Sequence, residues 1–259
     1  MNKDHKEEMN RCLKELRLSA VRQQYPEIAE KCRAEGTSYE LYLLNVLRQE
    51  CDLRRERRIE RYLHESHLPL EKTLESFDLK RLPPESMRQV KTLLEGEFIG
   101  HKENLLVFGN PGSGKTHLVC GLAQGLIRRD KRVYFTTCAL LLQQLLKAKK
   151  ELKLTRLLKS LGHFDALIID DIGYVQQEKE EMEVLFTLLA DRYERGSVII
   201  TSNLPFSKWN NIFKDPMMTA AAVDRIVHHS VILELNIDSY RIDSAKKRKI
   251  IAAHKSSKS

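Results

Sequence analysis

The chain has 259 residues, of which 42% are hydrophobic and 31% are charged, a composition typical of a globular protein with one sizeable core and a smaller module. The start of the chain lacks the apolar segment of a signal peptide and no stretch approaches the length of a membrane span, so we expect a cytoplasmic protein with no membrane partner. The net charge of +8 favours an anionic partner such as nucleic acid, and five widely spaced cysteines without a C-x-x-C pair argue against zinc or redox chemistry.

The first 66 residues are predicted to form a small helical module that binds DNA or a partner. They contain almost no glycine or proline, and leucine, isoleucine and tyrosine recur at helical spacing among dense charges. Ser38, followed by Tyr-Glu-Leu, is typical of a helix N-cap, and we expect a long helix to begin there. Residues 67–97 begin with a proline-containing stretch of mixed polarity and are interpreted as a linker that leads into a helix.

Residues 98–259 are predicted to form an α/β domain with a basic C-terminal tail. Strand-like and helix-like segments alternate here, a pattern that indicates a parallel sheet covered by helices on both faces. A final helix is expected near the C-terminus. The predicted strands are 104–108, 132–137, 165–170, 197–202 and 231–235, and the main predicted helical segments are 115–129, 178–194 and, as more than one helix, 139–161.

The stretch LLVFGNPGSGKTHL at residues 105–118 contains the spacing of a phosphate-binding loop, G-x-x-x-x-G-K-T. Glycines let backbone N–H groups turn toward phosphate oxygens, Lys115 brings a cation to the terminal phosphates, and the Thr116 hydroxyl is a magnesium ligand. The helix expected to begin here adds the positive end of its dipole. We therefore predict that ATP and Mg²⁺ bind here, through Gly109, Asn110, Pro111, Gly112, Ser113, Gly114, Lys115, Thr116 and His117.

Polar side chains follow two later strands of the predicted sheet. Asp170 ends the apolar run ALII and is predicted to hold Mg²⁺ with Thr116, while Asp171 projects one residue further, where a base can orient the attacking water. Two acids at a strand end also cap turns, but the phosphate loop upstream favours catalysis. Asn203 ends VIITSN and is a candidate sensor of the water or the γ-phosphate, although an Asn before Leu-Pro is by itself typical of a turn.

The order of these motifs, GNPGSGKT, IIDD, TSN and then DPMMTAAAVDRIVHHSVILEL with SYR after it, resembles the AAA+ ATPases of the initiator and helicase-loader clade. The stretch IDDIGYVQQEKEEMEVLFTLLADRYERGSVIITSNLPFSKW is similar to the IstB-type helper ATPases of bacterial insertion sequences. The resemblance covers the whole chain and is strongest over 98–243. It implies a P-loop AAA+ core, with Arg225 as an arginine finger acting on a neighbouring subunit's ATP, Arg241 as the sensor-2 arginine and Phe77 stacked on the adenine.

Three of the site assignments have alternatives in the residues themselves. Many AAA+ members have Glu where this chain has Asp171, whose side chain is shorter by one methylene. The transition state of phosphoryl transfer needs cations beyond Lys115, which suits an arginine, but a single residue such as Arg225 is also commonly a surface arginine. A Phe in a linker is as often part of the core. If Arg225 acts in trans, the active form is a homo-oligomer.

Three basic regions compete as contacts for double-stranded DNA. If residues 140–161 form one continuous helix, Lys149, Lys153 and Arg156 share a face. In initiator-clade relatives an extra helix at this place lines the DNA path, whereas the alternative is a solvated face over a leucine core. The arginine-rich run at 54–61 and the basic tail after Arg241 are the other regions. The first choice consists of Lys147, Lys149, Lys150, Lys153 and Arg156.

The motifs indicate a Mg²⁺-dependent ATPase. The resemblance implies an ATP-dependent DNA-binding transposition helper that oligomerises on target DNA and recruits or stimulates a partner transposase. A replicative helicase loader of the same clade is the alternative, because its ATPase core would look nearly the same. A small-molecule kinase or a GTPase is disfavoured, since the sequence has no Asn-Lys-x-Asp guanine motif.

Overall fold

The structure is a computed structural model that describes residues 3–173, 178–205, 208–209, 216–235 and 237. The chain divides into two compact units, Met1–Arg61 and Tyr62–Ser259. The roles expected for residues 1–66, 67–97 and 98–259 stay predictions. The predicted last helix, Arg241 and the basic tail lie outside the described residues. None of the helices in the described ranges combines the length and the apolar character that a membrane span requires.

The first unit is built from α1 (Lys3–Glu15), α2 (Ser19–Ala34) and most of α3 (Tyr39–Glu65). The Ser38 Oγ accepts a hydrogen bond from the Leu41 backbone N–H at 3.3 Å, so the predicted N-cap of α3 is confirmed. The carboxylate of Glu50 is buried, pairs with Arg54 at 2.8 Å and accepts the Ala20 N–H at 2.8 Å. These contacts join the start of α2 to α3 over a small core, which consists of Val21, Tyr25 and Val46 with Met9, Leu13, Leu18, Ile28 and Tyr42 around them.

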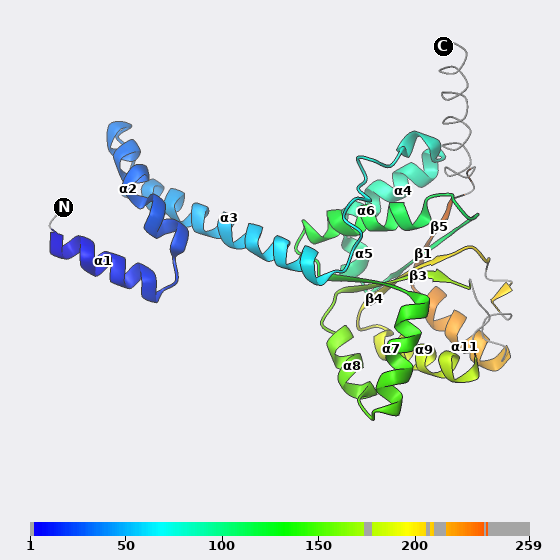
Figure 1. The fold of residues 1–259 in the computed structure, drawn as a ribbon. Helices are drawn as coiled ribbons and strands as arrows, with labels where there is room; N and C mark the ends of the chain where they lie inside the picture. The colour runs from blue at the N-terminus through cyan, green and yellow to red at the C-terminus, as the bar shows by residue number, and fades with distance from the viewer. Residues whose placement is uncertain (1–2, 174–177, 206–207, 210–215, 236, 238–259) are drawn as a thin grey trace, which may run out of the picture. The chain divides into compact units, whose positions relative to one another are not determined.

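The second unit is an α/β domain around a five-stranded parallel sheet of order β2-β3-β4-β1-β5, which confirms the predicted fold class (Figure 1). The strands lie within two residues of their predicted bounds: β1 (Asn104–Gly109), β2 (Val133–Thr137), β3 (Ala166–Ile172), β4 (Ser197–Ser202) and β5 (Ser230–Leu235). The short helix η1 (Leu79–Arg81) precedes the sheet. One face of the sheet is covered by α4 (Pro84–Glu95), α5 (Glu97–Gly100) and α6 (Lys115–Ile127), and the other by α7 (Cys138–Lys150), α8 (Leu154–Leu161), α9 (Lys179–Arg192) and α11 (Pro216–Val227).

The middle positions of the three central strands β1, β3 and β4 are apolar because both faces of these strands are buried. On the α7 side, leucines of α7 and α9 pack on Leu106, Leu167 and Ile200 in the main core cluster. Arg192, at the end of α9, is buried beneath this layer, and burial lowers its pKa to about 10, so it remains protonated at neutral pH. It ties α9 to the starts of β3 and β4 by donating to the carbonyl oxygens of Leu161, Phe164, Asp165 and Ser197.

The prediction of more than one helix across 139–161 is confirmed, and the continuous helix on which the shared basic face depended is not formed. Helix α7 ends at Lys150 and α8 begins at Leu154. Between them Leu152 takes a left-handed φ of 57°, a conformation that ends an α-helix. Lys149 and Lys153 therefore do not share a continuous helical face with Arg156.

Candidate nucleotide-binding site

The carboxyl ends of β1, β4 and β3 lie side by side because the three strands are parallel and consecutive in the sheet. Ser202, the last residue of β4, pairs with Phe108 of β1 on one side and with Ile172 of β3 on the other. The sheet therefore brings the phosphate loop after β1, the two acids of β3 and Asn203 after β4 to one edge, which we call the phosphate-loop edge.

The phosphate loop has the backbone that its glycines predict. Gly112 and Gly114 have φ values of 83° and 90°, in the region that favours glycine. A Cβ at Gly114 would lie 2.8 Å from the Phe77 ring. No side chain caps α6, whose N-terminus follows Gly114. The Lys115 Nζ, almost fully buried, donates to the carbonyl oxygens of Gly109 at 2.8 Å and Asn110 at 3.1 Å, so the amine lies over the loop.

The loop residues fit a polyphosphate. The Ser113 Oγ is buried and lacks a hydrogen-bond partner in the described part of the chain, which leaves a polar group that a phosphate oxygen would satisfy. The uncapped start of α6 offers backbone N–H groups and the positive end of a helix dipole. Lys115 adds a full positive charge at the same place.

A hydroxyl and a carboxylate meet beside the loop. The Thr116 Oγ1 lies 3.0 Å from each of the two carboxylate oxygens of Asp170, and both groups are ligand types that Mg²⁺ prefers. Burial raises the pKa of Asp170, the hydrogen bonds from Thr201 and Thr116 act in the opposite direction, and the nearby Asp171 raises the pKa further. Within the described ranges no group of three His, Cys, Asp or Glu side chains is placed to hold a metal.

The two acids lie at an irregularity in the sheet. The pairing of β3 with β4 shifts between Ile169 and Ile172, and Asp171 has a left-handed φ of 60°. Such a bulge points adjacent side chains in different directions. Asp170 accordingly lies inside, at 4% exposure, while Asp171 is exposed at the edge. This divergence allows the first acid to face a metal and the second to face water.

Thr201 is a site residue that the sequence analysis missed. Its hydroxyl donates to the Asp170 Oδ1 at 2.6 Å and accepts the Asp171 N–H at 2.9 Å, so a single group holds both acids. A polar residue in a strand whose six residues are all buried is the signal that could have identified Thr201. The neighbouring Ser202 Oγ donates to the Ile172 carbonyl at 2.9 Å and ties the ends of β4 and β3. The half-buried Asn203 follows directly, and its role as sensor stays a prediction.

The linker before α4 runs along α6. The His117 Nε2 lies 2.9 Å from the Thr73 carbonyl oxygen and 3.0 Å from the Ser76 Oγ, and the Phe77 and His117 rings meet edge to face at 5.4 Å. The Gln124 Nε2 adds a 3.0 Å hydrogen bond to the linker carbonyl of residue 72. Phe77 thus lies against the phosphate loop, whereas His117 faces the linker. Their predicted contacts with the nucleotide stay predictions.

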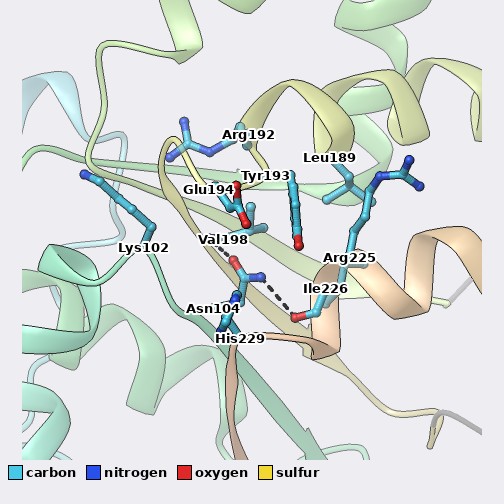
Figure 2. Close-up of a pocket in the computed structure, with 10 residues that line it drawn as sticks. All are labelled: Lys102, Asn104, Leu189, Arg192, Tyr193, Glu194, Val198, Arg225, Ile226 and His229. Atoms are coloured by element: carbon cyan, nitrogen blue, oxygen red, sulfur yellow. Dashed lines mark hydrogen bonds between the residues drawn. The ribbon is translucent and has the colours of Figure 1, made fainter.

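Arg225 lies at the other edge of the sheet. It is in the last turn of α11, and Ser230, just beyond this helix, pairs with Asn104 at the start of β1. Arg225 lines a small pocket with Asn104 and Val198, the latter near the start of β4 (Figure 2). The length of β1, about 17 Å at 3.3 Å per residue, separates this Arg225 edge from the phosphate loop of the same chain. The guanidinium is held locally, by a 3.0 Å bond to the Ala221 carbonyl and by stacking at 4.8 Å on the Phe186 ring.

The candidate DNA contacts fall into two groups. Lys149 pairs with Glu183 at 3.2 Å and Lys153 pairs with Glu151 at 2.8 Å. The other three, which are exposed and have no ion pair within the described ranges, are Lys147, Lys150 and Arg156. In the arginine-rich run, Arg54 pairs with Glu50 and the Arg57 Nη1 donates to the Ser19 Oγ at 3.3 Å. Among the five candidate DNA contacts, Lys147, Lys150 and Arg156 are therefore the most available.

Solved structures of similar fold include replication proteins. The DnaC helicase loader matches with a TM-score of 0.53 and 19% identity, over 69% of this chain and 99% of that one. AMPPCP-bound DnaA from Aquifex aeolicus matches with a TM-score of 0.54 and 19% identity, over 71% of this chain and 56% of that one. These similarities show the fold alone, a parallel sheet between two layers of helices.

Sequence relatives are closer and cover nearly the whole chain. An insertion sequence ATP-binding protein of Sinorhizobium fredii is 44% identical over 238 residues, which is 92% of this chain and 80% of that one. The IS21 ATP-binding protein of Pseudomonas aeruginosa is 34% identical over 244 residues, 94% of this chain and 92% of that one. Residues 11–249 match the family described as IstB-like ATP binding protein. The chain therefore belongs to the IstB-like ATP-binding proteins, the family that its motifs resemble.

Proposed function

We propose that this protein is a Mg²⁺-dependent ATPase that assembles on double-stranded DNA when ATP is bound and then recruits or stimulates a partner transposase. The observation that carries the proposal is the placement of the cations on the two edges of the sheet. The phosphate-loop edge gathers Lys115, Asp170 and Asp171, whereas Arg225 stands at the opposite edge. A second copy that brings its Arg225 edge to this site supplies the remaining cation, so nucleotide binding and self-assembly are linked.

The side chains divide the reaction among them. Lys115 binds the terminal phosphates and offsets their charge, and Thr116 and Asp170 are placed to hold Mg²⁺, which would neutralise charge on the phosphates when bound. Asp171, exposed on the bulge, orients water toward the γ-phosphate and accepts its proton. Asn203 hydrogen-bonds the water or the γ-phosphate. The neighbour's Arg225 stabilises charge that develops on the transferred group, a task that suits a guanidinium.

Transposition as the process is supported by the relatives, which carry the names of insertion sequence ATP-binding proteins. DNA is supported by the net charge of +8 and by the exposed cations Lys147, Lys150 and Arg156. A few phosphate contacts on each subunit become tight binding when many subunits act together. Because ATP and DNA both favour the assembled state, each strengthens the binding of the other. Hydrolysis then dismantles the assembly.

The test measures self-assembly by light scattering and binding of a duplex DNA by fluorescence anisotropy, each with ATP, with ADP and without nucleotide. ATP is expected to promote assembly and to tighten DNA binding, with a steep loss of affinity as salt rises. Addition of the transposase from the same insertion sequence is expected to yield a complex only with ATP and DNA present. A monomer in every nucleotide state, with a DNA affinity that ATP leaves unchanged, would overturn the proposal.

A DNA-contact variant set sharpens the same experiment. The triple change Lys147→Ala, Lys150→Ala and Arg156→Ala is expected to reduce the salt dependence of DNA binding by about 0.9 in logarithmic slope for each DNA phosphate that the variant no longer neutralises. The matched control, Lys149→Ala with Lys153→Ala, removes cations already paired with Glu183 and Glu151 and is expected to change the slope less. Equal slopes for both sets would place the DNA elsewhere on the protein.

A further inference from the structure

Asn104 joins two elements at the Arg225 edge. It is the first residue of β1, and its Oδ1 accepts the Val198 N–H of β4 at 2.8 Å while its Nδ2 donates to the Ile226 carbonyl of α11 at 3.0 Å (Figure 2). Because Val198 offers a donor and Ile226 an acceptor, the orientation of the amide is determined. The Asn104 backbone N–H also donates to the His229 carbonyl at 2.7 Å. The start of β1 therefore holds the end of α11 through both side chain and backbone.

The end of α11 is where Arg225 is located, one residue before Ile226. The contacts of the guanidinium itself, to Ala221 on its own helix and to the Phe186 ring, determine how the side chain is folded over. These two contacts do not join the end of α11 to the sheet, so other groups must position it there. The Asn104 amide bonds this last turn to the strands.

We propose that Asn104 is a positioning residue for hydrolysis in the neighbouring subunit. By holding the end of α11 against β1 and β4, it places Arg225 where the neighbour's phosphate loop can meet it. The inference rests on the proposed function, in which Arg225 acts in trans. It also explains why a neutral amide is suited to the start of β1: only a side chain with both a donor and an acceptor can join the β4 backbone to the α11 backbone.

Two substitutions at this position test the hydrogen-bond donor and acceptor of the Asn104 amide. Asn104→Asp keeps an acceptor for the Val198 N–H but loses the donor and places a carboxylate next to the Ile226 carbonyl. Asn104→Thr keeps a residue that suits a strand but replaces the two separate amide atoms, which bond the two backbones, with one hydroxyl oxygen closer to the main chain. Each variant is expected to bind ATP like the parent and to hydrolyse it about tenfold more slowly, because a small displacement of a catalytic group has a large effect on rate. Tyr193→Phe is the control, since it removes a hydrogen bond to His228 in the same pocket and leaves the link between α11 and β1 intact.

Mixing two variant chains distinguishes a displaced Arg225 from a defect in the nucleotide site of the same chain. When an Asn104 variant is mixed with Lys115→Ala chains, its intact phosphate loop can meet the correctly placed Arg225 of the other chain. Hydrolysis per intact loop is therefore expected to recover toward the parent value. Arg225→Ala mixed with Lys115→Ala is the reference, because it should recover in the same way if Arg225 acts in trans at all.

The outcomes separate the inference from the function on which it rests. If Arg225→Ala recovers and the Asn104 variants do not, or if both Asn104 variants hydrolyse ATP at the parent rate, the positioning role is wrong and the function in trans stands. Without recovery of Arg225→Ala, action in trans is wrong and the inference falls with it. ATP affinity and thermal unfolding of each variant show that the chain is folded, and Asn104→Thr decides the case if Asn104→Asp is unstable.

Discussion

The two edges of the parallel sheet differ in how their cations are held. At the phosphate-loop edge, Lys115 is 6% exposed and its amine is bound by two carbonyl groups of its own loop. At the opposite edge, Arg225 is half-buried, stacked on Phe186 and bonded to one carbonyl of its own helix. The first edge forms its cradle within seven residues of chain, from Gly109 to Lys115, while the second presents a cation away from the phosphate loop of the same chain. In the proposed function, one chain builds the first site and a second chain completes it with Arg225.

The largest effect is expected from the acid that faces water. Asp171→Asn retains the left-handed backbone, which Asn tolerates, but removes the base, so hydrolysis should fall by about 10² to 10⁴ while ATP stays bound. Asp170→Asn should instead raise the Mg²⁺ concentration that nucleotide binding requires. Phosphate release and magnesium titrations of nucleotide binding distinguish the two. Hydrolysis at the parent rate by Asp171→Asn would assign the base to another residue and would show that the phosphate-loop edge is less complete than its geometry indicates.

Lys115→Ala tests the cradle itself. Loss of the buried cation should weaken ATP binding on the order of 100-fold, as expected for the loss of charge-assisted contacts with the phosphates. Lys159→Ala, which removes an exposed lysine of α8, is the matched control and should bind ATP like the parent. Equilibrium binding of a fluorescent ATP analogue measures both. Tight binding together with undiminished turnover in Lys115→Ala would contradict the assignment of the nucleotide to this edge.

Thr201→Val is expected to have an intermediate effect. The substitution keeps the shape of the side chain but leaves the Asp170 Oδ1 and the Asp171 N–H without the hydroxyl that joins them. Unfolding free energy should fall by about 1–3 kcal/mol, the usual result of leaving a buried polar group unpaired, and more Mg²⁺ should be needed for nucleotide binding. Thr201→Ser restores the hydroxyl and should recover both properties. If the Val and Ser variants behave alike in magnesium titrations, the hydroxyl has no role in holding the acids.

Much of the phosphate-loop edge was predictable because its chemistry is local in sequence. The glycines, Lys115 and Thr116 lie within eight consecutive positions, and the acids and Asn203 each end an apolar run. Alternation of strands and helices predicted the parallel sheet for the same reason. Thr201 was missed because its meaning depends on the register of β4 against the bulge in β3. The break at Leu152 has no glycine or proline to mark it.

The Arg225 edge depends on contacts between distant positions. Asn104 and Ile226 are 122 positions apart, and no spacing within the chain predicts their hydrogen bond. The parallel pairing of β1 and β5 places Arg225, just before β5, at the amino end of the sheet, whereas the phosphate loop follows the carboxyl end of β1. The sequence therefore identified the arginine through family resemblance, and the sheet topology explains why it must act on another chain in the proposed mechanism.

The smallest effect is expected where the linker meets the phosphate loop. His117→Ala removes contacts to the Thr73 carbonyl and the Ser76 Oγ and the ring packing that holds Phe77 beside Gly114. Thermal unfolding should show a loss of about 1–2 kcal/mol, from one or two partly exposed hydrogen bonds and an aromatic contact. ATP affinity should fall about threefold, because a linker that leaves the loop no longer restrains Phe77 at the nucleotide site.

Ser76→Ala is the matched control for this change, since it removes the exposed hydroxyl that contacts His117 and Thr73 and leaves the contact of His117 with the Thr73 carbonyl and the ring packing in place. It should alter ATP affinity less than His117→Ala does. If His117→Ala lowers thermal stability while ATP affinity equals that of the parent, the linker only stabilises α6 and does not contribute to the nucleotide site. If both properties fall together, the edge includes the linker, and nucleotide binding is then coupled to the segment that precedes the ATPase fold, because any movement of Phe77 must be shared by the residues bonded to His117.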